Sequence, residues 1–152
     1  VQLVKVGGPF DSTQTQLIRD LGLQDSIVML SGLSRDTLAG LYQHAAMTLV
    51  PSEREGFGLP VIEALACGSL VLANNIPPLR EGGGDAATYI PIADIDRWVA
   101  QVLHWLSHPD SLCPREVRQE QGRAFRWERH ARAIREAYLA LWERSAVTST
   151  PS

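Results

Sequence analysis

The chain is poor in cysteine, in lysine and in long apolar runs, and these shortages exclude several classes of protein. Only Cys67 and Cys113 are present among 152 residues, so the sequence predicts neither a disulfide framework nor a four-ligand zinc site. No apolar run approaches the roughly 18 residues that cross a bilayer. The N-terminal VQLVKVGG also lacks the basic start of a signal peptide. We therefore expect a soluble, cytoplasmic protein with reduced thiols.

Charge is unevenly distributed around a mild formal net charge of −3. Residues 1–114 carry 6 basic and 12 acidic groups, whereas residues 115–152 carry 8 and 5. A basic C-terminal part can mark a partner surface, and a solvated helix face explains it equally well. We expect no nucleic-acid partner. The length and the 45% hydrophobic content favour one compact domain.

Short apolar strands alternate with single helices along the first 90 residues. The predicted strands are QLVKV at 2–6, SIVML at 26–30, MTLVP at 47–51, SLVLA at 69–73 and a fifth at Ala87–Ile90. Strands that are apolar throughout indicate a parallel sheet covered on both faces. The predicted fold class is therefore α/β, a doubly wound, Rossmann-like parallel sheet with helices on both faces and a helical C-terminal segment.

The C-terminal segment carries two apolar stripes at helical spacing, which we expect to pack within the domain. The first stripe comprises Ile95, Trp98, Val99, Val102, Leu103 and Leu106, and the second comprises Ala131, Ile134, Tyr138, Leu141 and Trp142. The tryptophans on these stripes are interpreted as core residues. Residues 147–152 are expected to form a disordered tail.

The stretch EREGFGLPVIEALACG, residues 53–68, places one glutamate on each side of a glycine-rich turn. In a doubly wound sheet this turn would lie beyond the carboxyl end of a strand, where ligands bind. Gly56 and Gly58 permit close backbone approaches, and Pro60 suits the first turn of the helix that follows. The free amides from Gly58 to Val61, apart from Pro60, would then form an anion site for a phosphate or diphosphate.

The second glutamate of this stretch, Glu63, has almost wholly apolar neighbours, which predicts a buried charge that needs a ligand. Helical side chains lean toward the N-terminus, so its carboxylate is expected to face the same cleft as the amides. An ionised carboxylate only accepts hydrogen bonds and can take the two vicinal hydroxyls of a ribose. The alternative interpretation is a partly exposed helix glutamate, with Glu55 an ordinary loop charge.

The run from Glu55 to Gly68 resembles the signature of glycosyltransferase family 4, the retaining enzymes of the GT-B fold. In their C-terminal, nucleotide-sugar-binding domain two glutamates with seven residues between them stand within EGFGLPxxEAxACGxPV. The stretches VKVGGPF, SGLSRDTLAGLYQHAAMTLVPS and FRWERHARAIREAYLALW are similar to further motifs of the same domain. The likeness extends over nearly the whole chain.

This resemblance implies a role for each matching residue. Glu63 would hold the ribose hydroxyls, and Glu55 would face the donor sugar as the catalytic residue. The backbone of Phe57, Gly58 and Leu59 would receive the diphosphate, next to Gly56 in the same turn.

The resemblance also implies that the base rests near Leu33, Ser34 and Arg35, where backbone groups would read it. The donor would be a UDP- or GDP-linked hexose, and no metal or other cofactor would be required. The acceptor would be a sugar or a lipid.

The chain also departs from the family pattern. Met47 replaces an acidic residue, and Pro77-Pro78 replaces a glycine-rich pair in the predicted loop leading to Glu81. The family's Arg and Lys that neutralise the diphosphate lie on a loop that would precede Val1, while Lys5 falls inside a predicted strand. We therefore expect residues 1–146 to be a nucleotide-sugar-binding domain without its first strand and its Arg/Lys loop.

Such a domain would be part of a two-domain enzyme whose acceptor-binding N-terminal domain is missing, and would be inactive alone. Any membrane contact would be made by the full-length enzyme, at the cytoplasmic face. The alternatives are a nucleotide-binding or interaction module with no turnover, or a GT-B sugar-nucleotide epimerase or phosphorylase.

Other motif-like stretches favour structural roles. Asp94-Ile95-Asp96 has the form of a metal-binding D-x-D but opens a helix, where Asp is a common cap. Residues 82–85, GGGD, lack the GK[ST] of a P-loop and predict a mobile turn. The four histidines, 44, 104, 108 and 130, are expected to be surface residues.

Overall fold

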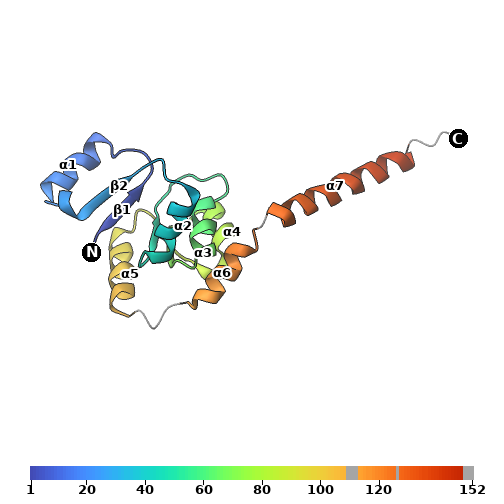
Figure 1. Cartoon of the computed structure of the whole chain (residues 1–152). Coiled ribbons are helices and arrows are strands. Elements are labelled where there is room, and N and C mark those ends of the chain that lie inside the picture. Colours follow the sequence, from blue (N-terminus) through green and yellow to red (C-terminus); the bar gives the residue numbers. More distant parts are fainter. Residues whose placement is uncertain (109–112, 126, 149–152) are drawn as a thin grey trace. The chain divides into compact units, whose positions relative to one another are not determined.

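The computed structural model describes residues 1–108, 113–125 and 127–148 (Figure 1). The chain divides into two compact units, Val1–Leu38 and Ala39–Ser152, and the boundary falls within helix α2, Arg35–His44. The described strands form one parallel sheet in each unit. The predicted α/β class is therefore confirmed. The assignment of residues 1–146 to one nucleotide-sugar-binding domain stays a prediction.

In the first unit, β1 (Leu3–Val6) pairs in parallel with β2 (Ile27–Leu30). They are connected by α1 (Ser12–Asp20) and the 3-10 turn η1 (Gln24–Ser26). Asp11 caps α1 by accepting a 2.8 Å hydrogen bond from the Gln14 amide. The Oε1 of the Gln14 side chain accepts a 3.1 Å hydrogen bond from the Asp11 amide, which completes a capping box. Lys5 lies in β1, as predicted, with its ammonium 5.0 Å from the centre of the Phe10 ring.

In the second unit, β3 (Thr48–Val50), β4 (Val71–Asn74) and β5 (Thr88–Ile90) form a parallel sheet in the order β3-β4-β5. The crossovers are α3 (Leu59–Ala66) and α4 (Pro77–Gly83), the latter followed by the 3-10 turn η2 (Gly84–Ala86). All four residues of β4 are buried. This explains why its sequence is apolar almost throughout, as a central parallel strand requires.

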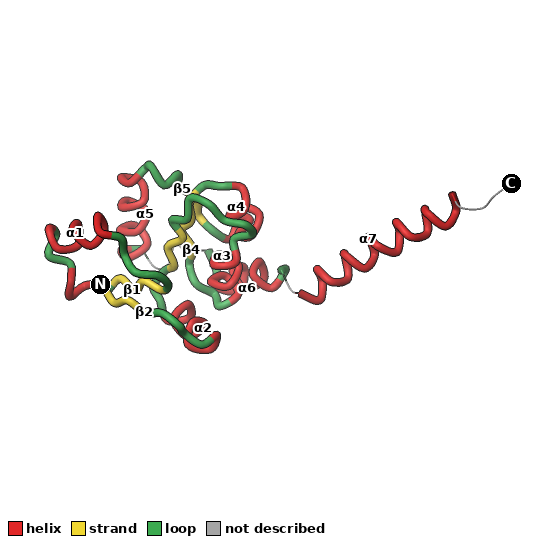
Figure 2. The backbone as a smooth tube through the Cα atoms, turned by 90° about the horizontal axis from the view of Figure 1, so that it is seen from above, coloured by secondary structure: helices red, strands yellow, loops and turns green. Residues whose placement is uncertain are grey.

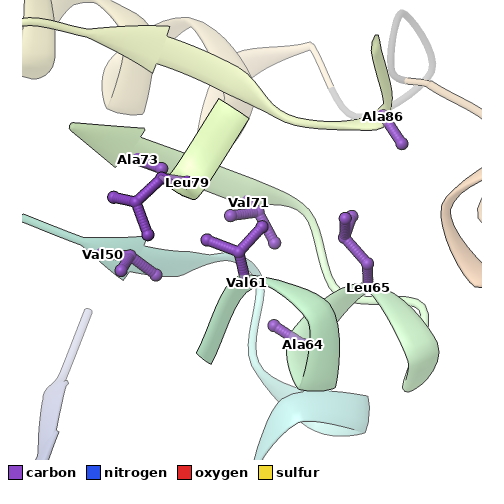
Figure 3. Close-up of a cluster of buried hydrophobic side chains, with 8 residues drawn as sticks. All are labelled: Val50, Val61, Ala64, Leu65, Val71, Ala73, Leu79 and Ala86. Atoms are coloured by element: carbon purple, nitrogen blue, oxygen red, sulfur yellow. The ribbon is translucent and has the colours of Figure 1, made fainter. Parts of the chain in front are cut away.

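Helices cover both faces of the second sheet. Figure 2 shows α5 (Ile95–Ser107) on one side of β4 and β5, and α3, α4 and α6 (Arg115–Arg123) on the other. Val71 and Ala73 point to α3 and α4 and join the buried cluster drawn in Figure 3. Leu72 belongs to a second cluster with Trp98 and Trp105 of α5. The doubly wound arrangement follows from this alternation.

The two predicted apolar stripes are only partly buried. In α5, Trp98 and Trp105 are buried, but the four stripe residues Ile95, Val99, Leu103 and Leu106 are exposed. The spacing of the two tryptophans selects the face of the helix that meets the sheet. In α7 (Trp127–Thr148), the stripe residues Ile134, Tyr138, Leu141 and Trp142 are exposed. Their predicted burial was wrong, since these residues are 44–71% exposed.

Sequence analysis predicted a loop at Pro77-Pro78 and a mobile turn at residues 82–85. In the structure this segment forms the helix α4 and the turn η2. Pro77 and Pro78 occupy the first turn of α4, where a missing amide proton costs nothing. Gly82 and Gly83 are buried, and a Cβ on Gly82 would lie 3.0 Å from Ile62 Cγ1. The prediction failed because glycine runs usually indicate turns, whereas here they permit α4 to approach its neighbours closely. The tail also differs: residues 147 and 148 end α7, and 149–152 lie outside the described residues.

Helix α6 packs on α3 through a glycine, which generates a stability prediction. A Cβ added to the buried Gly122 would overlap the backbone of Ala66. We expect Gly122→Ala to lower the free energy of unfolding by about 1–3 kcal/mol, the usual effect of overpacking. Urea denaturation measures this difference.

The matched control is Gly40→Ala in α2, where the added Cβ meets nothing within 4 Å. Alanine favours a helix more than glycine does, so this variant should gain up to about 1 kcal/mol. Equal stabilities of the two variants would contradict the close α3–α6 packing.

Candidate functional site

The loop of residues 51–58 leads from the carboxyl end of β3 into α3, and a buried amide fixes its start. Asn74, at the end of β4, donates a 3.0 Å hydrogen bond from Nδ2 to the Ser52 carbonyl. Its Oδ1 accepts a 2.9 Å bond from the Ile92 amide. One side chain thus joins the loops that follow β3 and β5 at the edge where doubly wound sheets bind ligands. Sequence reasoning missed Asn74, although an amide ending a buried apolar strand was a usable signal.

The end of this loop is fixed by Gly58. Its φ of 76° is left-handed, and a Cβ there would lie 2.9 Å from the Pro78 carbonyl oxygen. Helix α3 starts at Leu59, so Pro60 lies in its first turn, as predicted.

The helix start offers fewer free amides than predicted. The Val61 amide donates to the Gly58 carbonyl at 3.0 Å, so it is occupied. In the described part of the chain, the Gly58 and Leu59 amides make no hydrogen bond. Those two donors, with the positive end of the α3 dipole, are what the turn presents to an anion.

The two glutamates lie on either side of the Gly58 turn. Glu55 is half-buried and Glu63 is exposed, so the predicted burial of the Glu63 charge was wrong. The apolar neighbours of Glu63 are buried on the other faces of α3, which leaves this one position outward. Neither carboxylate makes a hydrogen bond or ion pair with any residue that the structure describes. Both are available as acceptors for a ligand.

Besides burial, the charge of Glu63 raises the pKa of two neighbouring side chains. Burial, and secondly the Glu63 carboxylate, raise the pKa of Tyr42 to about 12. The same two causes raise the pKa of the Cys67 thiol, while Arg115 opposes them. Glu63 therefore lies close to Tyr42 of α2 and to the residue one turn further along α3. A thiol with a raised pKa is a poor nucleophile, so Cys67 is not a candidate for covalent catalysis.

The predicted diphosphate residues all fall on the same loop and helix start. Gly56 is exposed, and the side chains of Phe57 and Leu59 are 44% and 49% exposed. The Phe57 ring meets the edge of the Phe125 ring at a centroid distance of 5.8 Å and an interplanar angle of 75°. These residues follow one another on the loop and helix start that run from Glu55 to Glu63, and their contacts with a diphosphate stay a prediction.

The three predicted base-binding residues belong to the first unit. Ser34 caps α2, since its Oγ accepts a 3.1 Å hydrogen bond from the Thr37 amide. Arg35 is the first residue of α2 and is exposed, while Leu33 is half-buried. Their role in reading a base stays a prediction.

The remaining motif-like residues have structural roles. Asp94 caps α5 by accepting from the Arg97 amide at 3.3 Å, and it also pairs with the Arg97 guanidinium at 3.7 Å. His44, His104 and His108 are exposed, as predicted, and the His130 side chain lies outside the described residues. Among described residues, no three His, Cys, Asp or Glu side chains gather as metal ligands. None of the described helices combines the length and apolar character needed to cross a membrane.

The family described as "Glycosyl transferases group 1" matches residues 1–125. The chain belongs to this family. This domain, the C-terminal half of GT-B glycosyltransferases, is the one that the motif around Glu55 and Glu63 indicated. The resemblance to this glycosyltransferase family that the sequence showed is therefore confirmed.

Curated relatives include two kinds of glycosyltransferase. An MMP alpha-(1->4)-mannosyltransferase of Mycolicibacterium hassiacum is 35% identical over 115 residues, which cover 74% of this chain and 28% of that protein. A D-inositol 3-phosphate glycosyltransferase of Mycolicibacterium smegmatis is 29% identical over 146 residues, covering 91% and 33%. The chain spans about a third of the length of these relatives.

Solved structures agree with the fold. Sucrose-phosphate synthase from Thermosynechococcus elongatus superposes with a TM-score of 0.81 at 26% identity, covering 94% of this chain and 39% of that one. A pneumococcal O-GlcNAc transferase in complex with UDP and GlcNAc has a TM-score of 0.74 at 18% identity, covering 90% and 29%. The second likeness concerns the fold alone.

The Asn74 bridge generates a stability prediction. Asn74→Ala leaves the partly buried Ser52 carbonyl and Ile92 amide without these partners, so we expect a loss of about 1–3 kcal/mol in the free energy of unfolding. The control is Asn75→Ala, an exposed position whose Oδ1 accepts from Arg80, with an expected change within about 0.5 kcal/mol. Thermal or urea unfolding of both variants compares them. A smaller loss for Asn74→Ala than for its neighbour would refute the bridge.

The proximity of Glu63 to Tyr42 generates a titration prediction. A pKa raised to about 12 means that neutral Tyr42 stabilises the fold below pH 10, and that this contribution is lost between pH 10 and about 12. Glu63→Gln should lower the pKa of Tyr42 but leave it above 10, because burial is the larger cause. Carbon-13 NMR of the tyrosine ring measures the titration. Glu81→Gln is the control, and an identical Tyr42 pKa in both variants would show that Glu63 lies elsewhere.

Proposed function

We propose that this domain binds the nucleotide-sugar donor of a retaining hexosyltransferase. The observation that carries the proposal is the pair of carboxylates on either side of the Gly58 turn, at the carboxyl edge of the sheet, neither of which has a partner among the residues that the structure describes. A surface glutamate with no partner is common, but two of them beside two free amides form a set of acceptors and donors. That set matches a ligand with hydroxyls at both ends and an anion between them.

Each part of the site then takes one part of the donor. The Gly58 and Leu59 amides receive the diphosphate at the start of α3. Glu63 accepts hydrogen bonds from the ribose hydroxyls. Glu55, on the loop, faces the hexose and stabilises the positive charge that develops as the glycosidic bond breaks. The base lies near Leu33, Ser34 and Arg35, and the site works without a metal ion.

Several observations support a hexose as the transferred group. The family is one of glycosyl transferases, and two relatives are named as a mannosyltransferase and a D-inositol 3-phosphate glycosyltransferase. Since the chain spans about a third of such proteins, we propose that it acts as the donor half of a two-domain enzyme. The acceptor, a sugar or a lipid, would bind to the other domain. Arg and Lys side chains outside this chain would neutralise the leaving UDP or GDP.

The two proposed carboxylate roles are separable by mutation. Glu63→Ala should weaken free UDP or GDP and the complete nucleotide sugar alike, by roughly 1.5–3 kcal/mol, because the ribose is common to both. Glu55→Ala should leave the affinity for the free diphosphate unchanged and weaken only the complete donor. Calorimetry of both variants with both ligands, in the full polypeptide that the gene encodes, makes the comparison.

Glu53→Ala is the matched control, an exposed loop glutamate two residues before Glu55. It should change neither affinity. Equal losses for the free diphosphate in Glu55→Ala and Glu63→Ala would disprove the division of roles. Unchanged affinities in both variants would show that the two glutamates are ordinary surface charges.

A further inference from the structure

The loop that carries Glu55, residues 51–58, has few interactions that fix its conformation. Its start is tied by the Ser52 carbonyl and its end by the left-handed Gly58. Between them, residues 53–57 make no hydrogen bond or ion pair with the described part of the chain. The interaction that the structure does show for this segment is the edge-to-face contact of Phe57 with Phe125. Its 5.8 Å centroid distance and 75° angle fall in the favourable range for aromatic pairs.

Phe125 has a fixed position because the helix that precedes it, α6, is hydrogen-bonded to the C-terminal end of α3. Arg115 and Arg118 donate hydrogen bonds of 3.0 and 3.1 Å to the Cys67 and Gly68 carbonyls, beyond the last turn of α3. The Phe125 amide donates to the Gly122 carbonyl at 3.4 Å, and Gly122 itself packs on the α3 backbone. The Phe125 ring is therefore held relative to α3.

We propose that Phe125 is a positioning residue that fixes the Glu55 loop by holding the Phe57 ring. Phe57 lies two residues after Glu55, so the ring contact restricts the backbone between Ser52 and Gly58 where no hydrogen bond does. The Leu59 amide and the Glu63 carboxylate belong to α3, and Gly58 is the N-cap of that helix, so these groups do not need this contact. Loss of the Phe125 ring should therefore loosen the glutamate on the loop and spare the one on the helix.

The consequence for ligand binding rests on the proposed function. If Glu55 faces the sugar, a Phe125 variant should lose affinity for the complete nucleotide sugar and retain affinity for free UDP or GDP. A purely structural role for Phe125 would instead weaken both ligands together, since the whole turn would be disturbed. The ratio of the two affinities distinguishes positioning from general stability.

The first measurement needs no ligand. 4-Fluorophenylalanine labels the three phenylalanines of this chain together with any others of the encoded polypeptide, so the resonances of Phe10, Phe57 and Phe125 are each assigned by their loss on substitution, and that of Phe10 serves as an internal reference. In the full encoded polypeptide, Phe125→Leu keeps the bulk but removes the ring. We expect the Phe57 resonance to shift and narrow, and that of Phe10 to stay. An unchanged Phe57 resonance would overturn the proposal.

The second measurement is calorimetry with UDP, GDP and their hexose conjugates. Phe125→Leu should weaken the conjugate by roughly three- to tenfold, the range of one aromatic pair, and free diphosphate by less than about twofold. Phe125→Tyr should restore the affinity, and Tyr138→Leu, at an exposed aromatic of α7, should not alter it.

The two measurements fail separately. Equal weakening of both ligands would overturn the positioning role. If the unaltered protein binds no nucleotide at all, the proposed function fails, while the fluorine spectrum still decides whether Phe125 holds the loop.

Discussion

Helix α3 is held at both ends by close approaches of backbone to backbone that a side chain would prevent. At its start, Gly58 lies against the Pro78 carbonyl of α4, and at its end Ala66 lies against Gly122 of α6. The carbonyls of Cys67 and Gly68, which the end of a helix leaves without partners, receive two arginine side chains. The buried residues of α3 then pack on the sheet (Figure 3). The orientation of the proposed donor site depends on these contacts.

The same packing explains why the two carboxylates of the proposed site have no partners within the described chain. Four residues of α3 are buried, which leaves Glu63 outward with no partner within the described chain. The loop before α3 is tied at its two ends but not between them, so Glu55 keeps a free carboxylate. A site of this kind places its reactive groups on a loop that a rigid scaffold supports. The scaffold is the buried β4 strand, through Asn74, together with α3.

The comparisons separate what the fold decides from what it leaves open. Relatives named as a mannosyltransferase and as a D-inositol 3-phosphate glycosyltransferase share this domain, so membership of the family does not by itself name a sugar. Binding a nucleotide diphosphate needs only a helix start and backbone amides, which many sequences can supply. Under the proposed function, selection between donors would come from the residues around the sugar. The positions of Glu55 and of the segment after Pro77 are therefore the places where specificity would arise.

The sequence by itself determined the order of the strands and of the helices before β4, the family and the position of the glutamate pair. These are local properties: apolar strands, Gly58 before a proline and a fixed spacing of charges report on the backbone nearby. It did not determine that α4 is helical, that Glu63 is exposed or that α7 presents an uncovered apolar side. It also missed Asn74 and the Phe57–Phe125 contact, whose partners lie 22 and 68 residues apart. Only the tertiary structure decided these, because burial and contact depend on which distant segment packs against a residue, and no local pattern contains that information.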